Sequence, residues 1–350
     1  MDSLSDIVDV VIGVDTHVET HSAAALDART GGVLGELTVE TTPDGYIQLV
    51  AFADEHSGLR AWAVEGTGGH GAGLTRHLRS ADELVIELDR PERAKRRHGA
   101  KSDPLDAIRA AREALAREKL GTPRTGGQRQ ALSVLLAARR SAVDASTVAQ
   151  RQLFSLVIAA PEVLRRRFRG KKLPAMLRAG AHLRLDPSWD LETATTAAVL
   201  RDLARRALTM AKEAATHEKA ILAVVRSWRP ELLDQPGVGP IVAATVLCAW
   251  SHPGRVRSEA AFAMLAGTAP IPANGGQVTT HYRLNRYGDR QLNRAMHTVV
   301  LNRLRYDEET QAYAKRRTAE GKTPREIKRC LKRYLTRSLF RLLEDPPSAA

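Results

Sequence analysis

Two acidic residues each follow a short apolar run, in positions where their side chains could act together. Asp15 ends the run at residues 8–14, and Glu65 ends a second run at residues 59–64. Ligands of open α/β sheets gather outside the carboxyl ends of the strands, so we expect these two acids to converge. Neighbouring carboxylates repel each other unless a cation neutralises them, and oxygen ligands suit Mg²⁺ or Mn²⁺. The pair therefore predicts a divalent metal site.

A second acidic pair, Asp103 and Asp106, stands three residues apart at the expected start of a helix. This spacing places both side chains on one helix face, where they could join the same site. Helix capping explains the same residues without a metal, with Asp103 as the N-cap and Pro104 in the first turn. The two roles are compatible. Together the four acids predict a catalytic site in which divalent ions would polarise a scissile phosphate.

Basic residues outnumber acidic ones in the 350-residue chain, 53 against 40, which gives a formal net charge of +13. This balance favours a polyanionic partner, and nucleic acid before a membrane, although a merely basic soluble protein has the same composition. The aromatic fraction of 4% is too low for base stacking to be the main mode of binding.

The chain starts with an acidic segment and has no apolar run of about 18 residues, so neither a secretory signal nor a membrane span is expected. Its two cysteines, Cys248 and Cys330, form no CxxC pattern, which argues against a zinc site. These features predict a cytoplasmic protein that does not bind a membrane.

Turn residues and apolar runs predict an α/β domain with a mixed sheet over residues 1–125. Strands are expected at residues 8–14, 21–26, 33–41, 59–64 and 83–88, and helices at 44–56, 71–80 and from 103 onward.

Residues 126–229 predict a helical or coiled-coil region, because apolar residues recur there at helical spacing. Helices at 128–158 and 191–227 should form an antiparallel pair on either side of a basic separator. Residues 230–343 predict a mainly helical third domain with a loop at 268–288, and residues 344–350 predict a frayed tail.

Two groups of features predict nucleic-acid contacts. Gly237 and Gly239 lie in a Pro-Gly-Val-Gly-Pro segment typical of a helix-hairpin-helix turn, although a simple tight turn has the same residues. Residues 283–341 contain seventeen Lys and Arg against six Asp and Glu, and a capping box at Thr323 opens the last basic helix. The expected phosphate-binding side chains are those of Arg93, Lys95, Arg96, Arg97, Lys101, Arg283, Arg286, Arg290, Arg294, Lys328, Arg329, Lys332 and Arg333.

Several of these segments resemble one known family. Val-Asp-Thr-His around Asp15, Val-Glu-Gly-Thr-Gly around Glu65 and Lys-Ser-Asp-Pro-Leu-Asp-Ala around Asp103 are similar to the DEDD motif of the IS110 family of insertion-sequence transposases. Residues 250–254, 269–273, 283–286 and 293–295 resemble the transposase domain of that family.

The resemblance implies a RuvC-like fold, of the RNase H type, for the N-terminal domain. It implies that Asp15, Glu65, Asp103 and Asp106 are the catalytic metal ligands, and that a C-terminal domain supplies a nucleophilic serine. It also implies a structured non-coding guide RNA that bridges donor and target DNA, and a dimeric or tetrameric assembly.

The chain departs from the family pattern at the serine, because the corresponding position is Gly275. Glycine has no hydroxyl group, and the nearest hydroxyls belong to Thr279, Thr280 and Tyr282. We therefore expect a transposase whose strand transfer is impaired, uses a nearby hydroxyl, or gives way to purely metal-driven cleavage. Two other functions fit the same residues: a structure-specific nuclease similar to a junction resolvase, and a non-catalytic repressor that binds nucleic acid.

Overall fold

The computed structural model describes residues 3–88, 103–118, 120–124, 126–272, 282–285 and 287–345, without the side chains of residues 103, 283 and 284. The chain divides into two compact units, residues 1–126 and 127–350. In the described residues no helix is long and apolar enough to span a membrane.

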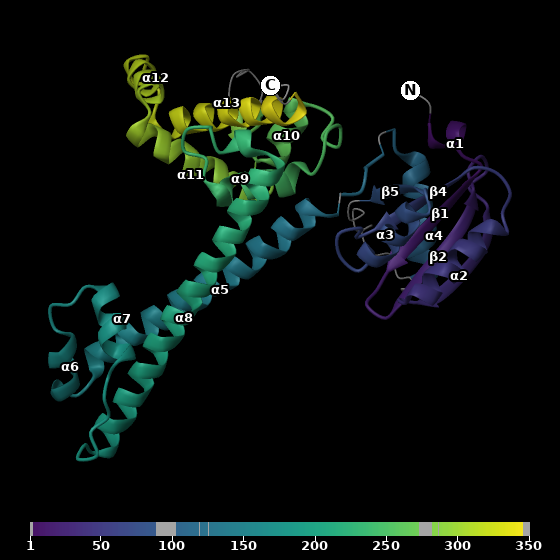
Figure 1. The fold of residues 1–350 in the computed structure, drawn as a ribbon. Helices are drawn as coiled ribbons and strands as arrows, with labels where there is room; N and C mark the ends of the chain where they lie inside the picture. Colours follow the sequence, from purple (N-terminus) through teal and green to yellow (C-terminus); the bar gives the residue numbers. More distant parts are fainter. Residues whose placement is uncertain are drawn as a thin grey trace. The chain divides into compact units, whose positions relative to one another are not determined.

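The first unit is built on a five-stranded mixed sheet with the order β3-β2-β1-β4-β5 (Figure 1). Strands β1 and β4 are parallel, as are β4 and β5, whereas β1–β2 and β2–β3 are antiparallel. The elements in chain order are α1 (Leu4–Ile7), β1 (Val10–Thr16), β2 (Thr20–Asp27), β3 (Val33–Glu40), α2 (Pro43–Asp54), β4 (Arg60–Glu65), α3 (Ala72–Ser80), β5 (Leu84–Leu88) and α4 (Asp103–Ala116). These elements confirm the expected α/β class and its five strands.

Helices cover both faces of this sheet, which is why its central strands are apolar throughout. Side chains alternate between the two faces along a strand. Val10, Ile12 and Val14 of β1 belong to the core under α2 and α3, whereas Val11 belongs to the core under α4. Asp15 has the same parity as Val11, so its side chain is directed to the α4 face.

Helix α4 packs directly on β1 because the strand has a glycine at the crossing point. A Cβ atom added at Gly13 would lie 2.0 Å from the carbonyl oxygen of Ala107 and 2.6 Å from the amide nitrogen of Ala111. Any larger residue at position 13 would push the helix off the strand. This close approach fixes the first turns of α4 beside the carboxyl end of β1.

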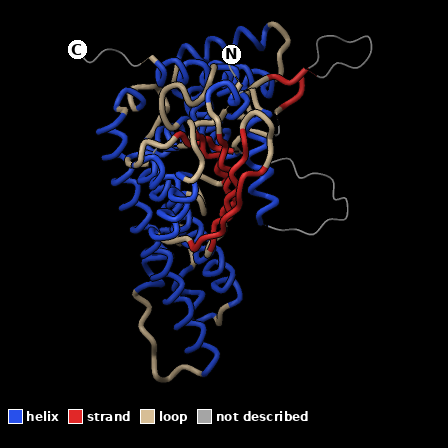
Figure 2. Tube along the Cα trace, turned by 90° about the vertical axis from the view of Figure 1, so that its right-hand side faces the viewer, coloured by secondary structure: helices blue, strands red, loops and turns tan. Residues whose placement is uncertain are grey.

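The second unit is helical apart from one short ribbon, which Figure 2 shows in red beside the helices of this unit. Its elements are α5 (Gln128–Ala159), α6 (Glu162–Phe168), α7 (Leu173–Ala181), α8 (Leu191–Trp228), the 3₁₀ turn η1 (Pro230–Leu232), α9 (Pro240–Trp250), α10 (Glu259–Leu265), β6 (Pro270–Pro272), β7 (Tyr282–Leu284), α11 (Arg290–Tyr306), α12 (Glu308–Ala319) and α13 (Pro324–Glu344).

Helices α5 and α8 lie side by side and antiparallel over most of their length (Figure 1). Arg139 of α5 donates a hydrogen bond to Glu218 of α8. Further along α5, Ser146 donates to the carbonyl oxygen of Ala207, which lies earlier in α8. The residue numbers rise on one helix as they fall on the other, which confirms the antiparallel pairing expected from the sequence.

The last helices form a separate core around α9, whose apolar residues are buried on nearly every side. Here the structure corrects one expectation, because the predicted loop at 268–288 contains the antiparallel strands β6 and β7. Each strand has only three residues, and two of those in β6 are prolines, so neither shows a recognisable strand period. The capping box at Thr323 is present, with Thr323 Oγ1 accepting from the amide of Glu326 and the Glu326 carboxylate accepting from the amide of Thr323.

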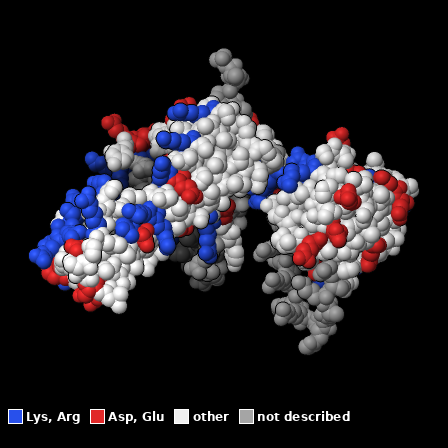
Figure 3. All heavy atoms as spheres, turned by 60° about the horizontal axis from the view of Figure 1, so that its bottom comes forward, with Lys and Arg blue, Asp and Glu red and all other residues white. Residues whose placement is uncertain are grey.

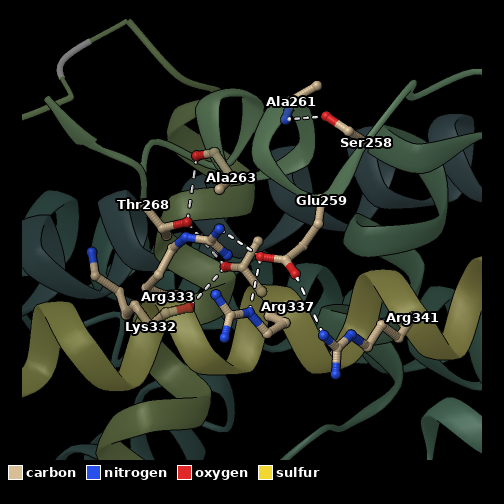
Figure 4. A network of polar contacts seen from close by, with 10 residues as sticks. Ser258, Glu259, Ala261, Ala263, Thr268, Lys332, Arg333, Arg337 and Arg341 are labelled. Atoms are coloured by element: carbon tan, nitrogen blue, oxygen red, sulfur yellow. Dashed lines mark hydrogen bonds and ion pairs between the residues drawn. The ribbon is translucent and has the colours of Figure 1, made fainter.

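An ion-pair network joins α10 to α13. Arg333, Arg337 and Arg341 lie one turn apart on α13 and converge on Glu259, the first residue of α10 (Figure 4). Burial alone would raise the pKa of Glu259, but hydrogen bonds from Arg337 and Arg333 hold it below its usual value. Three of the cations on this helix are therefore engaged within the protein.

Candidate active site

Two strands bring Asp15 and Glu65 to the same edge of the sheet. The parallel register of β1 and β4 runs from Val10 opposite Arg60 to Val14 opposite Val64, so Asp15 and Glu65 follow at the next position. Thr16 Oγ1 donates a 3.0 Å hydrogen bond to the carbonyl oxygen of Glu65, which ties the two strand ends together. Because partners in parallel strands point to the same face, both carboxylates face α4.

The electrostatics of Glu65 show which acids share its surroundings. Burial raises the pKa of Glu65 to about 7 from 4.5, and the negative charges of Asp15, Asp106 and Glu113 add to the shift. Burial and nearby negative charges both disfavour the ionised form of a carboxyl group. The structure thus brings three of the four predicted acids into one electrostatic neighbourhood, and Asp103 stands in the same first turn of α4 as Asp106.

Further polar groups surround these acids. His17 Nδ1 lies 3.5 Å from Asp15 Oδ2, and Arg109 donates a 2.6 Å hydrogen bond to Asp106. Beyond Glu65, Thr67 Oγ1 donates to the buried carboxylate of Glu87 at 2.9 Å, which holds the turn after β4 in place. The sequence pattern assigned none of these residues to the site.

Glu113 is the acid that the sequence analysis missed. It lies seven residues after Asp106 on α4, and residues seven apart occupy the same face of a helix, two turns along. This spacing was a usable signal. It was concealed because Glu113 also pairs with Arg117 four residues later, the pattern of an ordinary solvated helix.

The donor set suits a hard divalent cation. Asp15, Glu65 and Asp106 offer only carboxylate oxygens, which favour Mg²⁺ or Mn²⁺ over softer metals. Burial raises the pKa of Glu65 most and repulsion by the neighbouring acids adds to it, and a bound cation would relieve that repulsion. As they stand, the described side chains contain no group of three or more His, Cys, Asp or Glu close enough to hold a metal ion. The Asp103 carboxylate lies outside the described atoms.

A basic face extends over α11 and α13 in the second unit. Arg290 and Arg294 on α11 and Arg329 on α13 are exposed, and Lys328 is half-buried. Partial burial, followed by the positive charges of Lys332 and Lys328 on α13, lowers the pKa of His297 on α11. These residues form a candidate nucleic-acid interface.

Two cations predicted to contact nucleic acid have partners inside the protein instead. Lys332 is buried, its Nζ donates a 3.0 Å hydrogen bond to Asn293 Oδ1, and burial lowers the pKa of its amino group. Arg333 is bound to Glu259. These contacts argue against phosphate binding by Lys332 and give Arg333 a competing acidic partner. The sequence predicts Lys332 among the phosphate-binding cations, whereas the structure buries it on the same helix as Ile327 and Leu335.

The turn between η1 and α9 is exposed and held by its neighbours. Gly237 adopts a positive φ of 76°, and Arg303 Nε donates a 2.8 Å hydrogen bond to the carbonyl oxygen of Pro236. No atom lies within 4 Å of a Cβ added at Gly239, so the backbone there is open to an approaching group. The geometry is compatible with both interpretations of the segment, a phosphate-binding turn and a simple tight turn.

Several predicted residues lie outside the described residues or side chains: Arg93, Lys95, Arg96, Arg97, Lys101, Gly275, Thr279, Thr280, Arg283 and Arg286. Their predicted roles remain predictions.

Comparison with known proteins gives three matches. A family model described as a transposase with the IS110-type DEDD domain matches residues 12–159, which contain all four acids. A second model, described as the transposase IS116/IS110/IS902 family, matches residues 230–315. The insertion element IS900 uncharacterized 42 kDa protein of Mycobacterium paratuberculosis is 30% identical over 115 residues, which are 33% of this chain and 29% of that protein.

A mixed α/β unit with clustered acids at its strand ends, followed by a basic helical unit, and matched along both parts by transposase models, defines a protein of the DEDD transposase class. The chain belongs to the IS110 family of transposases.

Proposed function

We propose that this protein is a DNA transposase of a mobile insertion sequence, which cleaves and exchanges DNA strands in a metal-dependent reaction. The observation that carries this proposal is the shared electrostatic neighbourhood of Asp15, Glu65 and Asp106, inside a domain that matches the DEDD transposase model. An RNase H-type fold for the first unit agrees with the mixed sheet and with the acids at the ends of β1 and β4.

Asp15, Glu65, Asp106 and, by the family motif, Asp103 would hold Mg²⁺ or Mn²⁺, which when bound supplies charge neutralisation at the scissile phosphate and at the leaving oxygen. The chain's own groups prepare this site. Gly13 lets α4 approach β1, and the bond from Thr16 to Glu65 keeps the strand ends in register. His17 beside Asp15 can donate a proton or a hydrogen bond to an oxygen at the site.

The basic face of α11 and α13 would hold the phosphate backbone of the DNA, and by family resemblance of a guide RNA, through Arg290, Arg294 and Arg329. A homo-oligomer would bring together the sites needed for two DNA ends. Strand exchange also needs a nucleophile near the phosphorus atom, and Gly275 offers none at the family position. Thr279 and Thr280 are the nearest candidate substitutes.

The test is a strand-cleavage assay on labelled DNA carrying the ends of the element, with matched guide RNA and Mg²⁺. We expect cleavage by the natural protein, and a loss of at least about 100-fold in each of the variants Asp15→Asn, Glu65→Gln and Asp106→Asn, because charge stabilisation at the phosphate is removed. The matched control is Glu36→Gln, since Glu36 is an exposed acid on β3. Cleavage that persists in all three site variants would exclude this site.

Covalent trapping on a denaturing gel separates the reaction types. A protein–DNA adduct in the natural protein that Thr279→Ala or Thr280→Ala abolishes would identify a threonine nucleophile. An adduct that forms only after Gly275→Ser would show that strand transfer is impaired by the missing serine. Cleavage without an adduct in either form would favour the junction-resolvase-like nuclease, and binding without cleavage would favour the repressor.

A further inference from the structure

Basic residues predominate at the far end of the α5–α8 pair, where Glu162 and Asp186 flank them in the sequence. Residues 163–185, which include most of α6 and all of α7, contain eight Lys and Arg and no Asp or Glu. All eight side chains are exposed, and Figure 3 shows Lys and Arg gathered over this end of the unit. We call them the tip surface: Arg165, Arg166, Arg167, Arg169, Lys171, Lys172, Arg178 and Arg184.

A compact apolar core fixes the tip surface to the long helices. Leu164 and Phe168 of α6 and Leu177 of α7 are buried in a cluster with residues of α5 and α8. Helix α7 packs closely on α8, since a Cβ added at Gly180 would lie 2.9 Å from Cβ of Ala204. The apolar sides of α6 and α7 are therefore used in packing, and the cations stand on the outer side of a fixed support.

Acids at the edge of the tip surface offset some of these cations, and Asp186 lies close enough to Arg167 for the two charges to interact. Glu162 is shared by Arg165 and Arg169, and Arg167 lies over the ring of Trp189, 5.1 Å from its centroid. Within the described part of the chain, Arg166, Lys171 and Lys172 have no carboxylate partner. An ordinary solvated surface balances the two signs, whereas a surface on which cations predominate concentrates a field that attracts negative charge.

The turn between α6 and α7 places two further cations where positive charge is unfavourable. Gly170 has a φ of 72° and reverses the chain, so Lys171 and Lys172 stand at the start of α7. The N-terminal end of a helix is itself positive, and cations there are unfavourable unless an anion is bound nearby. Lys172 occupies the N-cap position and makes no side-chain capping bond.

We propose that the tip surface binds the phosphodiester backbone of nucleic acid, as a contact separate from the basic face of α11 and α13. The proposal rests on the proposed function only in taking nucleic acid as the partner. Guanidinium groups form planar forks that match phosphate oxygens. Six of the eight cations are arginines, and the other two are lysines, which act as point charges.

The position of the tip surface would let this contact lengthen the nucleic-acid binding site of the protein. Helix α5 has 32 residues, so at a rise of 1.5 Å per residue the pair extends for about 48 Å. The tip surface lies at one end of the pair and α11 and α13 at the other (Figure 1). A nucleic acid that contacts both ends would be held over roughly 14 base pairs, at about 3.4 Å per pair. The tip would thus extend the footprint of the protein without reading sequence.

The test measures binding of the full-length protein to a 40-base-pair DNA duplex and to a folded RNA hairpin over a range of salt concentrations. The tip variant combines Arg166→Ala, Lys171→Ala and Lys172→Ala. The slope of log K against log salt is negative, and each lost phosphate contact makes it shallower by about 0.9 for duplex DNA. We expect the slope for the tip variant to be shallower by about 2 to 3 on one or both probes. We also expect its affinity at 0.1 M salt to fall by at least tenfold.

The matched control combines Arg206→Ala, Lys212→Ala and Lys219→Ala, which removes the same charge from exposed positions along α8. We expect its slope to stay within one unit of the natural value. A photo-crosslinking residue at Leu185, which is 41% exposed beside the tip surface, should give adducts with the labelled probe in a chain that keeps all eight cations.

Equal binding by the natural protein and the tip variant, with no crosslink from position 185, would contradict the proposal and leave the proposed function intact. Failure of the natural protein to bind either probe would contradict both. Binding to phosphatidylserine vesicles that the tip variant loses, with nucleic-acid binding unchanged, would assign the surface to anionic lipid and overturn the proposal. Thermal unfolding by circular dichroism confirms that each variant is folded.

Discussion

At the scale of single residues, the raised pKa of Glu65 has a consequence for stability. The pKa is about 7 in the folded protein against 4.5 for a free side chain, mainly because of burial and then because of Asp15 and Asp106. Between these two values the folded protein binds more protons than the unfolded chain. Glu65 therefore contributes a fall in the free energy of unfolding as pH rises through this window.

We expect the melting temperature of the protein in a chelating buffer to fall between pH 5 and pH 7.5, which brackets the Glu65 shift. The variant Glu65→Gln should have a flatter profile, because its amide does not titrate. Circular dichroism melts at intervals of pH measure this directly, with Glu36→Gln on the exposed side of β3 as the control. Parallel profiles for the natural protein and Glu65→Gln would show that Glu65 ionises normally.

The residues also show where sequence reasoning succeeds and fails. The positions of Asp15 and Glu65 near the ends of β1 and β4 could be predicted, because each residue closes an apolar run and a local pattern fixes the strand end. Lys332 could not, because its burial depends on Asn293, which is 39 residues away in sequence. A residue whose partner lies on another helix carries no local sign of that contact.

At the scale of elements, α4 positions the acids of the candidate site, and Gly13 positions α4. We expect Gly13→Ala to lower the free energy of unfolding by about 1–3 kcal/mol or more, because the new methyl group would overlap the helix backbone. Denaturant unfolding measures the loss. The matched change is Gly126→Ala, where no atom lies within 4 Å of the added Cβ.

The same change gives a second readout at the site. A displaced α4 separates Asp106 and Glu113 from Glu65, so the pKa of Glu65 should move toward its ordinary value in Gly13→Ala. The pH profile of the melting temperature reports this shift. An unchanged profile together with unchanged stability would show that β1 and α4 tolerate the methyl group and that the crossing is looser than described.

Long, regular elements were the most predictable ones. The helices expected at 128–158 and 191–227 are α5 and α8, within one residue at each end. The sequence predicts only a basic separator where α6 and α7 lie, because runs of Arg and Lys obscure the short apolar stripe of Leu164 and Phe168. The β6–β7 ribbon was missed because its pairing is between segments ten or more residues apart with no alternating pattern.

At the scale of the whole molecule, charge is divided unequally between the two units. Residues 1–126 contain 21 Asp and Glu against 15 Lys and Arg, whereas residues 127–350 contain 19 against 38. The net charge of the whole chain, +13, is therefore lower than the net charge of the second unit, which has twice as many basic as acidic residues. An acidic unit repels a polyanion unless its carboxylates are neutralised, whereas the basic unit attracts one in any buffer of moderate salt.

This division predicts which cations govern the salt dependence of nucleic-acid binding. Replacing Arg290, Arg294 and Arg329 together with Ala should lower the slope of log K against log salt by about 2 to 3 across unrelated duplex sequences, since each phosphate contact contributes about 0.9. All three side chains are exposed on α11 and α13, so their loss should leave the fold intact.

The control for this prediction removes three exposed arginines from the acidic unit, with Arg29→Ala, Arg76→Ala and Arg79→Ala in one chain. Both variants lose the same formal charge, so a change in slope that depends only on net charge would be equal in the two. We expect the control to keep the natural slope, because counterions are released only where a cation contacts phosphate. If the slope became shallower by the same amount in both variants, the net charge of the protein would govern binding, and direct contacts of the α11–α13 face would not.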